Sequence, residues 1–282
     1  LITFKNSKII NFPRFIKSIC CMYLGLKFLL LKKNAVLISY ESNLFAIILS
    51  KFTRVPIIVR SNASPSGYIQ NPLKLLIFKF FFKNADVVLV NSLEFKTKID
   101  KILNIKSKIL YNSIIGKKKL LELSSKKIKK FIRKKKNLKI IIIGRLVKQK
   151  DQITILKALN LIKSKLNFFT LVIGKGELKN NLIKFCIENN IDDKIKFLKY
   201  KKNIYPYLKW SNALILSSKY EGSPNVLLEA ISMKKTVISS DCPTGPREIL
   251  QNGKGGYLFK TGDFLDLSKK IKICFFNKRE NK

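Results

Sequence analysis

A chain of 282 residues is long enough for two ordinary domains, each with its own buried core. A hydrophobic fraction of 46% with 26% charged residues is typical of a folded globular protein and argues against a disordered chain. The formal charge of +40 attracts polyanions, among them nucleic acid, anionic lipid headgroups and phosphorylated small molecules. Only seven of the 57 basic residues are arginine, the side chain that nucleic-acid recognition favours. The composition therefore argues against nucleic acid and leaves an anionic membrane surface as a candidate partner.

The cysteines indicate the compartment. There are five, with no C-x-x-C pair, and the chain has no histidine. This argues against a zinc site or a disulfide framework and favours a reducing, cytoplasmic environment. The apolar segment ICCMYLGLKFLLL (19–31) is interrupted by Lys27 and is short for a bilayer span. We interpret it as a buried helix in preference to an interfacial membrane helix.

Short β-branched runs alternate with longer helical patterns along the chain. Continuous apolar runs of this length fit parallel strands that are covered on both faces, with crossover helices between them. The sequence therefore predicts an α/β protein with doubly wound sheets in two Rossmann-like domains. The runs are AVLIS (35–39), PIIVR (56–60), DVVLVN (86–91), LKIIIIG (138–144), FFTLVIG (168–174), ALILSS (213–218) and TVISS (236–240).

A lysine-dense segment, GKKKLLELSSKKIKKFIRKKKN, separates the two blocks of strands. It lacks a strand pattern, so we interpret it as a solvated connector. The predicted domains are residues 1–115 and residues 138–282, with a basic linker over 116–137.

In the second block, GRLVKQKD places Arg145 and Lys150 around the loop where a strand ends at Gly144. Ligands of open α/β sheets bind beyond the carboxyl ends of strands, so these two cations are suited to a diphosphate. VIGKGELK repeats the strand-to-glycine exit at Gly174. There, a tight turn explains the glycine at least as well as ligand contact does.

The stretch YEGSPNVLLEA (220–230) follows another strand and predicts a helix that begins after Pro224. Backbone N–H groups near Asn225 and Val226 would favour an anion. Glu221 and Glu229 would repel a phosphate, and as paired acceptors they suit neutral hydroxyls. Sugar hydroxyls on either side of a diphosphate satisfy both requirements.

The first block offers weaker candidates. RSNASPSGYIQN (60–71), with Arg60 and Asn62, is a ligand-contacting loop or an ordinary polar loop. DVVLVNSLEFK offers Ser92 as a helix cap and Glu94 as a site candidate. LKLLIFKFFFK (73–83) interleaves apolar residues with lysine, which fits a membrane surface, or core packing.

The second-block motifs together resemble a known family. E-x7-E within EGSPNVLLEA, GRLVKQKD, and VISSDCPTGPREIL followed by GKGGYLF resemble, in order and spacing, the retaining glycosyltransferases of the GT-B fold, family 4 (glycosyl transferases group 1). The resemblance covers roughly residues 138–264. It implies a UDP- or GDP-sugar donor and transfer without a bound metal or other cofactor.

Carried over by position, the resemblance gives Arg145 and Lys150 the role of neutralising the departing diphosphate. Glu221 would hold hydroxyls of the transferred sugar and Glu229 the ribose hydroxyls, with Lys199 and Tyr200 near the base. The remaining donor-binding candidates are Gly144, Gly174, Ser223, Pro224, Asn225, Val226 and Leu227. The resemblance assigns residues 138–282 to the nucleotide-sugar and residues 1–115 to the acceptor side, where Arg60, Asn62 and Glu94 would lie.

The leading hypothesis is a cytoplasmic sugar transferase that acts at the inner face of a membrane on a glycan or lipid-linked acceptor. Its products would be cell-surface polysaccharide, lipopolysaccharide or glycoprotein glycans. The glycine-rich loop expected near the N-terminus is not found before Ala35, and the chain ends before the family's usual return helix. We therefore expect an incomplete first domain. An inactive remnant that still binds a nucleotide sugar is the alternative, followed by a basic nucleic-acid-binding protein.

Overall fold

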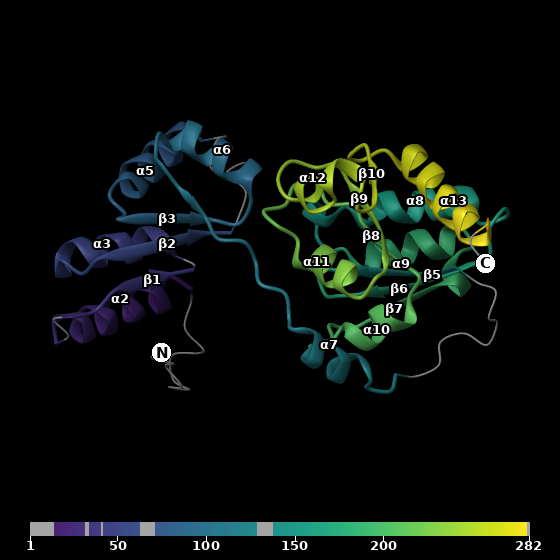
Figure 1. Ribbon diagram of the computed structural model, residues 1–282, viewed down its shortest axis with the longest axis horizontal. Helices are drawn as coiled ribbons and strands as arrows, with labels where there is room; N and C mark the ends of the chain where they lie inside the picture. The colour runs from purple at the N-terminus through teal and green to yellow at the C-terminus, as the bar shows by residue number, and fades with distance from the viewer. Residues whose placement is uncertain (1–13, 32–33, 41, 63–70, 129–137, 281–282) are drawn as a thin grey trace. The chain divides into compact units, whose positions relative to one another are not determined.

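The computed structural model describes residues 14–31, 34–40, 42–62, 71–128 and 138–280 (Figure 1). The chain divides into two compact units, Leu1–Tyr111 (unit 1) and Asn112–Lys282 (unit 2). Each unit is built on one sheet in which every strand pair is parallel. The predicted α/β class with two Rossmann-like domains is confirmed.

Unit 1 has a four-stranded sheet in the order β1-β2-β3-β4. Alternate residues of β2, such as Ile57 and Val59, are buried against the helices because successive side chains of a strand point to opposite faces. The strands are β1 (Leu37–Ser39), β2 (Ile57–Ser61), β3 (Val87–Val90) and β4 (Lys108–Ile109). The helices are α2 (Arg14–Leu30), α3 (Asn43–Thr53), α5 (Pro72–Lys83) and α6 (Leu93–Leu103).

Unit 2 has a six-stranded sheet in the order β10-β9-β8-β5-β6-β7. The strands are β5 (Leu138–Ile143), β6 (Phe168–Ile173), β7 (Ile195–Leu198), β8 (Ala213–Leu216), β9 (Thr236–Ser240) and β10 (Tyr257–Phe259). From β5 the chain first builds β6 and β7 on one side, and then returns to build β8, β9 and β10 on the other. The order of the strands therefore reverses between β5 and β8, which is the place where doubly wound sheets bind ligands.

Helices cover both faces of the unit 2 sheet. Ile140 and Ile142 of β5 pack with residues of α8, α9 and α13, whereas Ile141 packs with residues of α7, α10 and α11. Figure 1 shows α13 beside α8, and α7 beside α10. Burial on both faces is why β5 and β6 are mostly apolar, with Lys139 and Thr170 as the exceptions. The helices are α7 (Lys117–Ser124), α8 (Gln152–Ile162), α9 (Lys179–Glu188), α10 (Tyr205–Trp210), α11 (Asn225–Ser232), α12 (Pro246–Ile249) and α13 (Phe264–Glu280).

All seven predicted runs contain strands, but β4, β7 and β10 were not predicted. Each of the three lies at the edge of its sheet. They have only two, four and three residues, and lysine or glycine stands in or beside them, so none forms the longer apolar run that marks a central strand.

The segment predicted as a solvated connector begins with helix α7, which belongs to unit 2. Leu120 is buried in the core, and Leu123 O accepts a 2.8 Å hydrogen bond from Asn203 Nδ2. The two leucines, spaced along one helix, supply this packing face despite the surrounding lysines. Residues 129–137 of the expected linker lie outside the described part of the chain.

Helix α2 departs from the buried helix that we expected for the first apolar segment. Leu29 is buried, but Tyr23 is 66% exposed and Leu30 is 65% exposed. None of the helices within the described residues has both the length and the apolar composition needed to cross a membrane.

Candidate nucleotide-sugar site

The loops after β5 and β8 meet where the strand order of unit 2 reverses. These strands are hydrogen-bonded neighbours, and GRLVKQKD follows β5 while SSKYEGSPN follows β8. Carboxyl ends of adjacent parallel strands share one edge of the sheet, so the two most distinctive motifs of the sequence lie side by side.

Lys150 and Glu221 form an ion pair across this edge. Lys150 Nζ lies 2.5 Å from Glu221 Oε1, and the two side chains are only 16% and 8% exposed. Ser218 Oγ donates a second hydrogen bond to the same oxygen at 2.5 Å. Both partners compensate the carboxylate for the hydration that it loses at this depth.

Gln149 joins the same two loops. Its backbone carbonyl accepts from Lys219 N at 2.8 Å, and its Nε2 donates to Tyr220 O at 2.9 Å. Its Oε1 accepts from Nη2 of the exposed Arg145 at 3.1 Å. These contacts hold the β5 loop against the β8 loop and fix the position of Lys150 beside Glu221.

Helix α11 begins at Asn225, directly after Pro224, as the sequence predicted. Its first backbone N–H groups lie beyond the end of β8, and such groups favour an anion. Asn112 Nδ2 donates to Ser223 O at 3.2 Å and to Asn225 Oδ1 at 2.5 Å. Asn112 thus holds the start of this helix in place, a role that was not predicted from the sequence.

Glu229 lies half-buried on α11 and accepts a 3.3 Å hydrogen bond from the hydroxyl of Tyr205 on α10. Burial raises the pKa of Glu229, while the Tyr205 hydrogen bond acts in the opposite direction. The pKa of Tyr205 is raised to about 12, first by burial and then by the Glu229 charge. Burial removes water from the Glu229 carboxylate, so a hydrogen bond from any hydroxyl group that reaches it is favourable.

Gly144 follows β5 and Gly174 follows β6, and the two glycines differ in the space around them. A Cβ on Gly174 would lie 1.9 Å from the Gly144 carbonyl oxygen, so no side chain fits there. A Cβ on Gly144 would meet only the Lys150 side chain, at an ordinary 3.8 Å. Packing of the two strand exits therefore explains Gly174. At Gly144 the protein leaves room for a methyl group in contact with the Lys150 side chain.

Other side chains of this edge are structural or distant. Thr244 donates from its hydroxyl to the carbonyl oxygen of Glu221, and Leu227 is fully buried. Lys199 and Tyr200 follow β7, which is separated from β5 by β6, and Tyr200 is 65% exposed. Ser223 and Val226 flank the start of α11 and are half-buried.

The three acceptor-side candidates lie in unit 1. Arg60 and Asn62 line a cavity of about 480 Å³ beyond the ends of β1 and β2, together with Tyr40, Asn43, Phe78 and Phe82. The Arg60 guanidinium lies 5.9 Å from the centre of the Tyr40 ring and donates to Leu110 O at 3.1 Å. Glu94, on α6, instead pairs with Lys98 at 2.7 Å. Residues 63–70 of the predicted acceptor-side loop lie outside the described residues.

Metal binding and covalent chemistry depend on how the cysteine and carboxylate side chains are placed. Among the described residues, no three or more His, Cys, Asp or Glu side chains are grouped so that they could hold a metal ion. Burial raises the pKa of Cys242, near Glu221, to about 12. A thiol with that pKa stays protonated at neutral pH, which argues against Cys242 as a nucleophile.

Comparison with known proteins identifies the family. Residues 124–281, more than half of the chain, match the family described as Glycosyl transferases group 1. The chain belongs to this family. All the donor-side residues predicted from the sequence lie inside the matched region. The acceptor-side candidates of unit 1 lie outside it, as does Asn112 at the start of unit 2.

Two relatives show how far the similarity to glycosyltransferases extends. An uncharacterized glycosyltransferase of Methanocaldococcus jannaschii is 36% identical over 210 residues, which are 72% of this chain and 52% of that protein. The N-acetylgalactosamine-N,N'-diacetylbacillosaminyl-diphospho-undecaprenol 4-alpha-N-acetylgalactosaminyltransferase of Campylobacter jejuni is 29% identical over 214 residues, 72% of this chain and 55% of that protein. The chain thus spans about half the length of these two family relatives.

Solved structures agree on the fold. Anabaena HepE in complex with UDP superposes with a TM-score of 0.72 at 16% identity, covering 93% of this chain and 73% of HepE. The lipopolysaccharide outer core galactosyltransferase WaaB in its apo form gives a TM-score of 0.67 at 22% identity, covering 94% of this chain and 72% of WaaB. These similarities support the GT-B fold with its two Rossmann-like domains.

Several residues of the site were not predicted from the sequence. Gln149 lies inside GRLVKQKD and Ser218 ends the predicted strand run ALILSS, so a search for polar side chains at strand ends could have found them. Tyr205 and Asn112 offer no such signal, because each reaches α11 from a segment that is distant along the chain.

Proposed function

We propose that the chain is a retaining glycosyltransferase of family 4 that transfers a sugar from a UDP- or GDP-sugar to a glycan or lipid-linked acceptor. The observation that carries the proposal is the placement of the Lys150–Glu221 pair and Glu229 around the start of α11, at the strand-order reversal of unit 2. This edge combines cations for a diphosphate with carboxylates for hydroxyls on either side of it.

The diphosphate rests on the cationic part of the edge. Lys150 carries three N–H donors, so it can hold Glu221 with one and a phosphate oxygen with another. Arg145 is exposed and, with its planar fork, can bind two phosphate oxygens. When the bond between the anomeric carbon and the phosphate oxygen breaks, both cations stabilise the charge that collects on the leaving diphosphate.

The two glutamates bind the two sugars of the donor. Both protein bonds to Glu221 are made to Oε1, and we assign Oε2 to hydroxyls of the transferred sugar. Glu229 takes the ribose hydroxyls, which replace part of the hydration that burial removes. Asn225, Val226 and Leu227 offer backbone N–H groups to phosphate, and Lys199 and Tyr200 lie near the base. Transfer proceeds without a metal ion or other cofactor.

The acceptor binds in the unit 1 cavity. Aromatic rings such as Tyr40 and Phe78 offer flat apolar faces to a sugar ring, while Arg60 and Asn62 offer donors to hydroxyl or phosphate oxygens. The Campylobacter jejuni relative is named for a diphospho-undecaprenol acceptor. By analogy, the acceptor here is a lipid-linked or free glycan precursor of cell-surface polysaccharide, lipopolysaccharide or glycoprotein glycans, met in the cytoplasm at an anionic membrane surface.

The deciding experiment is a calorimetric titration of the chain with UDP and GDP, and then with their sugars. Glu229→Ala should lose binding, while Glu177→Ala, at an exposed carboxylate of the same unit, should bind as the wild type does. Retention is tested separately by NMR of the transferred sugar's anomeric proton. A well-folded chain that binds neither nucleotide would contradict the proposal.

A further inference from the structure

Helix α5 of unit 1 has two apolar faces. Its inner face buries Phe82, which is 2% exposed, in the unit 1 core with Leu75 and Phe78 packed beside it. The other face remains in solvent. Its apolar side chains and their exposed fractions are Leu73 (66%), Leu76 (64%), Ile77 (38%) and Phe80 (64%).

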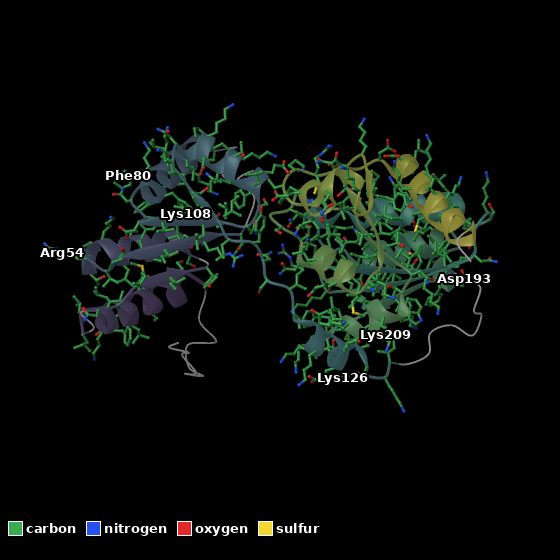
Figure 2. All side chains as sticks on the ribbon, viewed as in Figure 1. Arg54, Phe80, Lys108, Lys126, Asp193 and Lys209 are labelled. Carbon is green, nitrogen blue, oxygen red and sulfur yellow. The ribbon has the colours of Figure 1, made fainter. Side chains whose placement is uncertain are left out.

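These four side chains form one continuous stripe, which we call the α5 stripe. Their spacing of three, four and seven residues from Leu73 places them on one side of an α-helix. Phe80 is labelled in Figure 2 on α5. An exposed apolar stripe in addition to a buried inner face indicates a surface with a partner.

Lysines flank the α5 stripe. At 100° per residue, Lys79 and Lys83 lie along one edge of the stripe and Lys74 lies beyond the other. The helix contains no acidic residue, and the chain carries a formal charge of +40. An apolar stripe bordered by lysine can enter the headgroup region while the ammonium groups remain among lipid phosphates.

We propose that the α5 stripe docks on the surface of an anionic lipid bilayer. The lysines decide between this partner and a second copy of the chain, because packing two such helices against each other would bring like charges together. An anionic bilayer instead offers negative headgroups to the lysines and an apolar interior to the side chains of the stripe. The inference rests on the proposed function only in treating the membrane as the place where a lipid-linked acceptor is found.

The test is co-sedimentation of the full chain with vesicles of phosphatidylcholine, with and without phosphatidylglycerol. The wild type should sediment with the anionic vesicles, and added salt should weaken this binding. Leu76→Ser/Phe80→Ser should lower binding at least tenfold. The matched control Leu161→Ser/Ile187→Ser, which alters two exposed apolar side chains of unit 2, should bind as the wild type does.

A second pair of variants tests the charges and remains informative if the apolar variant fails to fold. Lys74→Gln/Lys79→Gln/Lys83→Gln should lose most binding to anionic vesicles. Lys196→Gln/Lys209→Gln/Lys254→Gln removes the same charge from exposed positions of unit 2 and should lose much less. Equal losses in the two triple variants would overturn the proposal, because they would mean that total charge alone drives binding.

Two further readouts separate this inference from the proposed function. UDP and GDP binding is measured on the same α5 variants and should be unchanged. Vesicle binding by a chain that binds no nucleotide would contradict the proposed function and leave the membrane contact supported. Sedimentation velocity without lipid should show no self-association; a dimer that the Leu76→Ser/Phe80→Ser change abolishes would assign the stripe to a second copy.

Discussion

Lys150 and Glu221 lie 71 positions apart in the sequence, yet their side chains form a 2.5 Å ion pair with little access to water. The pair joins the loop after β5 to the loop after β8, the two strands between which the order of the sheet reverses. It therefore has two effects. It stabilises the edge of the sheet, and it holds one ammonium group at the place proposed for the diphosphate.

Breaking this pair from one side should destabilise unit 2. Lys150→Met leaves the Glu221 carboxylate buried without its cation, which should cost about 3 kcal/mol or more of the free energy of unfolding. Lys150→Met/Glu221→Gln should recover most of that loss, because no unpaired charge remains. Denaturant unfolding of wild type, both single variants and the double variant gives the coupling energy. Additive losses would show that the two side chains do not interact.

Nucleotide affinity should depend on Glu229. A hydrogen bond to a charged group contributes about 1.5–3 kcal/mol, so Glu229→Ala should weaken UDP or GDP binding by roughly ten- to a hundredfold. Tyr205→Phe should weaken it less, because the carboxylate remains. Titration calorimetry measures both variants. Affinities equal to that of the wild type would remove Glu229 from the donor site.

The stability of the free protein should change with pH through Glu229. The folded-state pKa of this carboxyl group lies above its ordinary value of 4.5, because burial disfavours the charged form. Its protonated form therefore contributes stability that is fully present below 4.5 and is lost as pH rises through the raised pKa.

Glu229→Gln removes this pH dependence, and Tyr205 can still donate to the amide oxygen. At neutral pH the variant should have a higher Tm than the wild type, and the difference should close toward pH 4.5. For a unit of this size, each kcal/mol corresponds to about 2–4 °C. Thermal unfolding across this pH range measures it; a gap that widens toward acid would contradict the assignment.

The glycines at the two strand exits should respond in opposite ways to the same substitution. Gly174→Ala would place a methyl group 1.9 Å from the Gly144 carbonyl oxygen and should lower Tm or prevent folding. Gly144→Ala meets only ordinary contacts, so its Tm should stay close to that of the wild type. Because the new methyl group fills space beside Lys150, diphosphate binding should fall roughly tenfold, about 1.4 kcal/mol. Unchanged binding would mean that the ligand does not use this space.

The fold was predictable from the sequence where a strand is buried on both of its faces. β5 and β6 are covered on both faces, so their apolar runs mark them without reference to other segments. The edge strands β7 and β10 have only four and three residues, with lysine or glycine in or beside them, and were not predicted. Helix α7 was mistaken for a connector because its packing face is narrow and its exposed positions are mostly lysine.

The sequence by itself determined the α/β class, the positions of the central strands and the motifs around Arg145, Glu221 and Glu229. Spacing within a segment is local, so it fixes which residues share a loop or a helix. Only the tertiary structure decided that Lys150 pairs with Glu221, that Tyr205 donates to Glu229, and that Asn112 holds the start of α11. These contacts join segments that are distant along the chain. The first of them, between Lys150 and Glu221, exists because the strand order places β5 beside β8.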